Sequence, residues 1–167
     1  MQSTFYTDEE LKPIQGWLVF FIVCLALSGL TAIPAETELG FLFDHFVRGG
    51  NTGKWLQFVL TGIRETNAQY PFISYGYDWL AFAHFILAIL FIGPFRDPVR
   101  NKWIIEFGII ACVLVIPFAL IAGHFRGIPI GWRLIDCSFG VVGYIPLRIC
   151  LDKINRLEKK VIEYAAV

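Results

Sequence analysis

The sequence predicts an all-α integral membrane protein in which four transmembrane helices form a bundle, with residues 1–167 as a single membrane domain. Apolar residues make up 56% of the chain and the mean hydropathy is +0.61, a composition that soluble domains rarely have. Four nearly uncharged runs recur, each long enough for a helix to cross a hydrocarbon core of about 30 Å. Tryptophan and tyrosine stand at the start of the first two runs, as is typical of a membrane–water interface.

The four predicted spans cover residues 14–33, 72–95, 103–125 and 130–150. The residues before the first span are acidic, whereas a cleaved signal peptide begins with basic residues, so we expect a retained span. Gly93 and Pro94 are expected to end the second helix. Pro117 is expected to kink the third, because proline lacks the backbone donor that an unbroken helix needs.

The connection over residues 35–71 is polar enough to leave the membrane, yet its apolar residues recur at helical spacing. One face is formed by Leu39, Leu42, Phe43, Phe46 and Val47, and a second face by Trp55, Leu56, Val59, Leu60 and Ile63. A glycine-rich break separates the two, which predicts two short amphipathic helices. They either lie in the interface or cap the bundle, and we favour capping because so long a connection usually has a function.

The last span continues into a polar, helical tail over residues 148–164. Its apolar residues keep a spacing of three and four, namely Leu147, Cys150, Ile154, Leu157, Val161 and Tyr164. This pattern predicts a cytoplasmic extension of the fourth helix. The extension packs either on its own subunit or on a partner, which would be a second copy or another membrane subunit.

Basic residues in short connections predict the orientation. The turn between the second and third spans holds Arg96, Arg100 and Lys102, and five more basic residues follow residue 147. Both segments should therefore be cytoplasmic, which predicts a multi-pass protein of the inner (plasma) membrane with both termini inside. Glu106 and Arg148 should then pair, since each lies about one turn inside the cytoplasmic boundary.

Composition argues against several classes of function. The formal net charge is zero, so no affinity for nucleic acid is expected. The four cysteines show no close pair and no metal-type spacing, which argues against a disulfide framework and against dithiol redox chemistry. No known catalytic motif is present, so no catalytic residue is assigned and no cofactor or metal is predicted.

Polar residues near the outer ends of the spans are the candidate ligand-binding site. They are His84, His124, Arg126, Arg133, Asp136 and Asp78. An ionisable group near hydrocarbon is costly unless it is paired, hydrated or functional. His84 and Asp136 lie at similar depth, so we expect them to line one polar pocket with an arginine, covered by residues 39–64.

Four interpretations of this cluster remain open. The residues have ordinary packing and pairing roles, or they form a pocket at the outer leaflet in which the arginines bind an anionic group and aromatic residues hold an apolar tail. A haem or metal site would use His84 and His124, with or without His45. Proton or ion transfer would use Asp136 and His84. The predicted function is an accessory, assembly, or small-ligand or lipid-binding component; the alternative is a small membrane enzyme or a haem- or metal-binding redox component.

Overall fold

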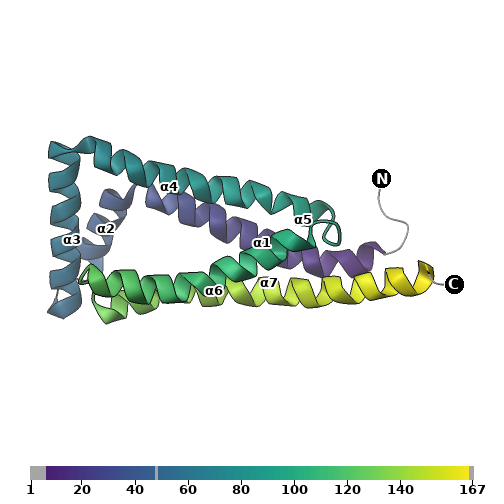
Figure 1. Cartoon of the computed structure of the whole chain (residues 1–167). Coiled ribbons are helices and arrows are strands. Elements are labelled where there is room, and N and C mark those ends of the chain that lie inside the picture. The colour runs from purple at the N-terminus through teal and green to yellow at the C-terminus, as the bar shows by residue number, and fades with distance from the viewer. Residues whose placement is uncertain (1–6, 48, 166–167) are drawn as a thin grey trace. The chain divides into compact units, whose positions relative to one another are not determined.

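A computed structural model describes residues 7–47 and 49–165, and every regular element in those ranges is an α-helix (Figure 1). In chain order the helices are α1 Asp8–Ala32, α2 Ala35–His45, α3 Gly50–Gln69, α4 Pro71–Leu90, α5 Ile92–Arg96, α6 Lys102–Phe125 and α7 Ile130–Ala165. Four stretches are long and apolar enough to cross a membrane: α1, α4 with α5, α6, and α7 as far as Lys160. The predicted four-helix membrane bundle is thereby confirmed.

Contacts divide the chain into two compact units. Unit 1 comprises Met1–Val23 and Ile89–Val167, and unit 2 comprises Cys24–Ala88. Unit 1 therefore holds the first part of α1 together with α5, α6 and α7, and unit 2 holds the end of α1 with α2, α3 and nearly all of α4. The single membrane domain predicted over residues 1–167 stays a prediction.

Helix α1 begins at Asp8, before the predicted span 14–33, because the side chain of Glu10 caps its first turn. The backbone N–H of Thr7 donates to Glu10 Oε2 at 3.1 Å, and Asp8, Glu9 and Glu10 place negative charge in the first turn. The T-x-x-E spacing is present in the sequence, so the start of α1 was predictable. Pro13 is tolerated within this helix.

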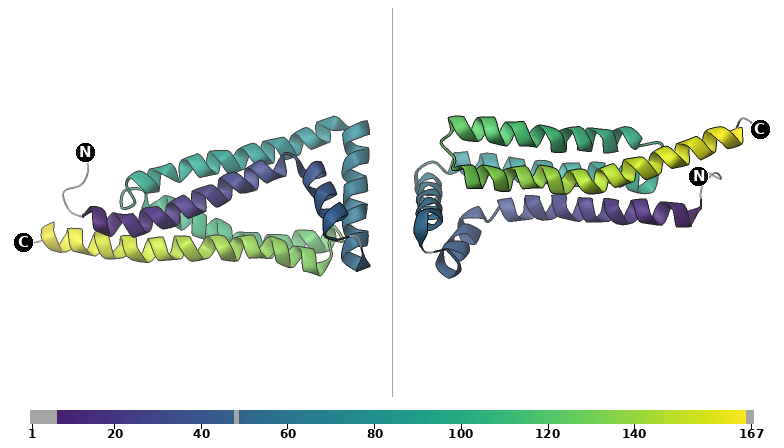
Figure 2. Two further views of the ribbon diagram at one scale, coloured as in Figure 1. Left: turned by 180° about the vertical axis from the view of Figure 1, so that it is seen from behind. Right: turned by 90° about the horizontal axis from the view of Figure 1, so that it is seen from below.

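In unit 1, α6 and α7 lie antiparallel and side by side (Figure 2). Glycines allow their backbones to approach closely. A Cβ added at Gly140 would lie 2.5 Å from the carbonyl oxygen of Cys112, and one added at Gly108 would lie 2.7 Å from Leu147. Small residues are typical where membrane helices meet, since packing rather than the hydrophobic effect holds them together.

The first part of α1 completes unit 1 by packing antiparallel to α7. The thiol of Cys150 donates to the carbonyl oxygen of Ile14 at 3.6 Å, and both residues are fully buried. Farther along α1, the rings of Phe21 and Phe91 lie 4.7 Å apart, and Gln15 Nε2 donates to the carbonyl oxygen of Phe95 at 3.3 Å.

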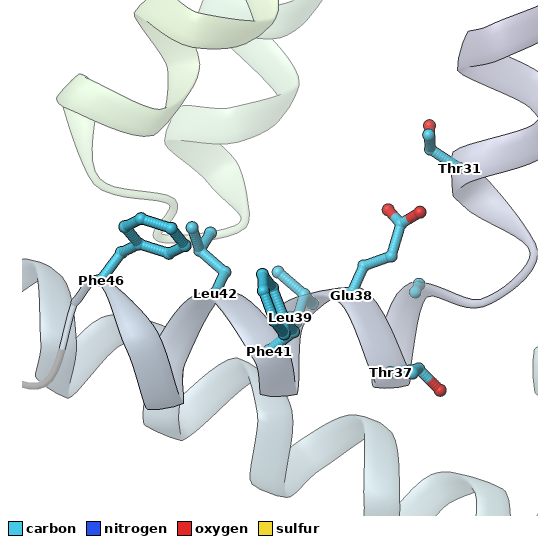
Figure 3. A pocket seen from close by; sticks show the side chains of 8 residues that line it. Thr31, Thr37, Glu38, Leu39, Phe41, Leu42 and Phe46 are labelled. Carbon is cyan, nitrogen blue, oxygen red and sulfur yellow. The ribbon is translucent and has the colours of Figure 1, made fainter.

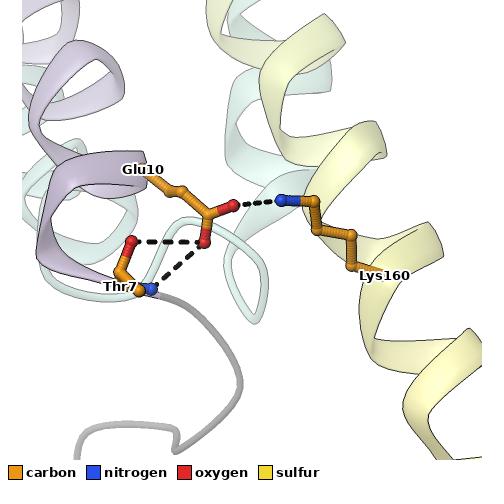
Figure 4. Close-up of polar contacts among 3 residues, drawn as sticks. All are labelled: Thr7, Glu10 and Lys160. Atoms are coloured by element: carbon orange, nitrogen blue, oxygen red, sulfur yellow. Dashed lines mark hydrogen bonds and ion pairs between the residues drawn. The ribbon is translucent and has the colours of Figure 1, made fainter.

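Helix α7 is too long for one span, because its 36 residues extend over about 54 Å at helical rise. The buried residues of its second half are Leu147, Cys150, Leu151, Ile154 and Leu157. Lys102 pairs with Glu158 at 2.6 Å, and Lys160 pairs with Glu10 across to α1 (Figure 4). This face of the extension therefore packs on its own chain; the side chains of Val161 and Tyr164 lie outside the described residues.

The expected ion pair between Glu106 and Arg148 is a wrong prediction. Arg148 pairs instead with Asp152, one turn along the same helix, at 3.1 Å, and both side chains are about half exposed. Glu106 is exposed and forms no ion pair with any described residue. The physical reason is that Asp152 lies one helical turn from Arg148, so the charge of the arginine is balanced within α7.

In unit 2, the end of α1 packs on α4 at Gly29. A Cβ there would lie 2.8 Å from the carbonyl oxygen of Ala81 and 3.1 Å from Cβ of His84. Two helices occupy the connection over residues 35–71, as predicted, and they pack against each other. The second, α3, is 20 residues long and only Tyr70 separates it from α4.

Candidate functional site at the α6–α7 turn

The six predicted site residues fall into two groups. His124, Arg126, Arg133 and Asp136 lie in unit 1, where α6 ends and α7 begins, and Asp78 and His84 lie on α4 in unit 2. Unit 1 therefore brings four of the six together at one end of a helix pair. The pocket shared by His84 and Asp136, and its cover by residues 39–64, stay predictions.

A tight turn joins α6 to α7 at this end. Gly127 adopts φ +68°, in the left-handed region that favours glycine, and its N–H donates to the carbonyl oxygen of His124. The N–H of Ile128 donates to the carbonyl oxygen of Gly123 at 2.8 Å. The carbonyl oxygen of Pro129 then accepts from the N–H groups of Trp132 and Arg133, in the first turn of α7. Helix α7 therefore starts back in the direction opposite to α6. The turn holds His124, Arg126 and Arg133 within a few residues of one another.

Arg133 is the residue that this turn positions most closely. Its side chain crosses the face of Gly123, where a Cβ would lie 2.5 Å from the arginine Cδ, so the stem needs the glycine. Its Nη1 donates to the carbonyl oxygen of Leu120 at 3.2 Å, in the last turns of α6. A cation near the C-terminus of a helix is stabilised by the helix dipole.

The guanidinium of Arg133 is incompletely satisfied. Its Nε is buried and has no hydrogen-bond acceptor. Arg133 also forms no ion pair with any described residue, although Asp136 is only three residues away on α7. A buried donor without an acceptor costs about 1–3 kcal/mol, and more when the group is charged. Arg133 therefore places a positive charge at this turn without an acidic partner among residues 7–47 and 49–165.

The other basic residues of the turn are open to their surroundings. His124 and Arg126 are exposed, and so is the intervening Phe125, at 82%. Ile130 is also exposed, at the start of α7. Positive charge and apolar surface thus lie next to each other at the end of two membrane helices.

The histidine of α4 is bonded within its own helix. His84 Nδ1 lies 2.8 Å from the carbonyl oxygen of Leu80, and because a carbonyl only accepts, Nδ1 carries the proton. His45 makes the same contact with Phe41. Asp78, on the same helix as His84, is exposed.

No group of three or more His, Cys, Asp and Glu side chains is placed to hold a metal ion among residues 7–47 and 49–165. The haem or metal site considered for His84, His124 and His45, and proton transfer through Asp136 and His84, stay predictions.

Sequence reasoning did not find a polar cluster that joins α2 to α3. Asn67 Nδ2 donates to Glu36 at 2.6 Å, Arg64 Nε donates to the same carboxylate at 3.4 Å, and Ser74 hydrogen-bonds to Asn67. We call Glu36, Arg64 and Asn67 the α2–α3 clasp; Ser74 extends it to α4. Glu36 lies about thirty residues before Arg64 and Asn67, so no pattern of neighbouring residues predicts their contact.

The chain was compared with protein-family models, curated proteins and solved structures, and nothing matches it.

Proposed function

We propose that this multi-pass membrane protein binds an anionic amphiphile, such as a phospholipid of net negative charge, at the α6–α7 turn. It would act in the inner (plasma) membrane as an accessory or assembly component. The observation that supports this most directly is the guanidinium of Arg133, which is fixed on Leu120 and yet retains a buried Nε without an acceptor.

The chemistry of arginine suits such a ligand. Its planar fork matches the oxygens of a phosphate or carboxylate, and charge-assisted hydrogen bonds are the stronger ones. Arg126 adds positive charge from the same turn, and the ring of His124 adds hydrogen-bonding nitrogens. Phe125 and Ile130 offer apolar contact to the tail of the ligand. One small region therefore complements both halves of an amphiphile.

The leaflet follows from the charge distribution. Glu10 pairs with Lys160, so the beginning of α1 and the end of α7 lie on the same side of unit 1. Arg96, Arg100 and Lys102 stand at the opposite end of α6 from the α6–α7 turn. If these basic residues face the cytoplasm, the turn faces the outer leaflet.

The test is lipid retention by the intact protein. The protein is reconstituted in nanodiscs that contain phosphatidylglycerol and phosphatidylcholine, and the lipids that stay bound after transfer to the gas phase are identified by native mass spectrometry. We expect phosphatidylglycerol to be preferred, and the preference to fall roughly tenfold in Arg133→Gln, the ratio expected when one charged hydrogen bond is lost.

Two further variants sharpen the result. Gly123→Ala keeps every charge but obstructs the stem of Arg133, so it should lose the preference as well. Arg148→Gln removes an arginine from the other part of α7 and should leave the preference unchanged. The proposal fails if Arg133→Gln retains phosphatidylglycerol as the unmodified protein does, or if Arg148→Gln loses it equally.

A further inference from the structure

Unit 2 contains an open hollow between the end of α1 and α2 (Figure 3). Its volume is about 710 Å³, and it is lined by Thr31, Ala35, Thr37, Glu38, Leu39, Phe41, Leu42 and Phe46. Small-molecule sites typically measure about 300–1,000 Å³. The hollow shares no residue with the α6–α7 turn, so what it binds is a separate question from the proposed function.

The two ends of the hollow differ in chemistry. Thr31 and the carboxylate of Glu38 lie at one end, and Leu42 and Phe46 lie at the other (Figure 3). Phe41 is exposed at 57% and Phe46 at 72%, which is a large apolar surface left uncovered by the described residues. An occupant that fits both ends has a polar head and an apolar tail.

The opposite face of α2 explains why these apolar residues stay uncovered by their own unit. Glu36 belongs to the α2–α3 clasp, and Gly40 is buried at a position where a Cβ would lie 3.6 Å from Arg64, so this face is turned to α3. Phe43 continues the same face three residues after Gly40 and is half-buried. The side of α2 that bears Glu38, Phe41 and Leu42 is therefore directed away from α3.

The negative charge of Glu38 indicates which polar head the occupant of the hollow carries. The side chain of Glu38 is exposed and forms no ion pair or hydrogen bond with any described residue. A carboxylate is an acceptor only, and the hydroxyl oxygen of Thr31 also accepts. A primary ammonium carries three donors and a positive charge, whereas a quaternary ammonium has no donor. The complement to this end of the hollow is a primary ammonium.

We propose that the hollow binds a phospholipid with a primary ammonium headgroup, of the phosphatidylethanolamine class. The ammonium donates to Glu38, and an acyl chain lies along Leu42, Phe41 and Phe46. The position favours a lipid because α2 directly follows α1, which is long and apolar enough to cross a membrane. Lipid is therefore the amphiphile present at the highest local concentration.

The experiment uses a photocrosslinker within the hollow. The full chain carries p-benzoylphenylalanine in place of Phe46 and is reconstituted in nanodiscs with equal amounts of phosphatidylethanolamine and phosphatidylcholine that have the same acyl chains. After illumination, the mass of the adduct identifies the occupant. The matched control places the same crosslinker at Phe118 of α6, which is exposed at 73%.

We expect phosphatidylethanolamine adducts at residue 46 to exceed phosphatidylcholine adducts by roughly threefold, the affinity ratio that one exposed ion pair produces. At residue 118 the two lipids should form adducts equally. Glu38→Gln should abolish the excess at residue 46, while Glu65→Gln, an exposed acid on α3, should not. Equal adducts at residue 46, an excess that persists in Glu38→Gln, or an adduct with a second copy of the chain would each overturn the proposal. Arg133→Gln should leave the excess intact, which separates this result from that of the phosphatidylglycerol test.

Discussion

Gly140 of α7 lies against the backbone of Cys112 of α6, so closely that a Cβ on residue 140 would be 2.5 Å from the carbonyl oxygen of residue 112. The obstructing atom belongs to a helix backbone, which cannot rotate away as a side chain does. The spacing between α6 and α7, and with it the position of the turn that carries Arg133, therefore depends on the absence of a side chain at residue 140.

Gly140→Ala should separate α6 from α7 and destabilise the protein by about 1–3 kcal/mol, the usual cost of inserting atoms into a filled interface. The measurement is thermal unfolding of the purified protein in detergent. Gly131→Ala is the control in the same helix, because a Cβ there would meet nothing within 4 Å. Equal melting temperatures for the two variants would show that the close approach does not matter.

The extension of α7 should depend on apolar packing rather than on its ion pairs. Ile154 is fully buried, and Ile154→Ala should cost about 2–5 kcal/mol. Lys160→Gln removes the pair with Glu10, in which the lysine side chain is more than half exposed, and should cost much less than Ile154→Ala. Thermal unfolding should show a larger loss of stability in Ile154→Ala than in Lys160→Gln. The opposite order would show that charge pairing holds the extension in place.

The α2–α3 clasp should control the stability of α2. Glu36→Ala removes the acceptor of both Asn67 and Arg64, so α2 should loosen from α3 by about 1–2 kcal/mol. Hydrogen exchange measured by mass spectrometry should show faster exchange in residues 35–45, with α6 unchanged. Glu65→Gln provides the control, as Glu65 is exposed and forms no ion pair with any described residue. Unchanged exchange over α2 would argue against the clasp.

Both ends of the chain should be cytoplasmic. In a variant without the native cysteines, a single cysteine at Lys12 or at Lys159 should react with a membrane-impermeant thiol reagent only after the membrane is opened. A cysteine at Phe58, on α3, should react in intact cells. The basis is the excess of Lys and Arg near Arg100 and in the tail. Labelling of residue 159 from outside would reverse the proposed leaflet of the α6–α7 turn.

The sequence by itself determined the class of the protein and the number of its spans. Long apolar runs must satisfy their backbone hydrogen bonds internally in lipid, so they can only be helices, and the structure confirms all four. The helices of the 35–71 connection were predictable for a similar reason, since their apolar residues recur at the helical period. The start of α1 at Asp8 was also present in the sequence, in the T-x-x-E spacing that lets Glu10 accept from the N–H of Thr7.

Tertiary structure alone decided which polar groups meet. Arg148 was expected to reach Glu106 and pairs with Asp152 instead, and Glu36 finds Arg64 and Asn67 far along the chain. The position of Arg133 depends on the antiparallel register of α6 and α7, which glycines at residues 123 and 140 permit. The physical reason is that hydropathy is a sum over a run of residues and survives uncertainty in register, whereas a hydrogen bond or an ion pair requires two particular atoms within about 3–4 Å.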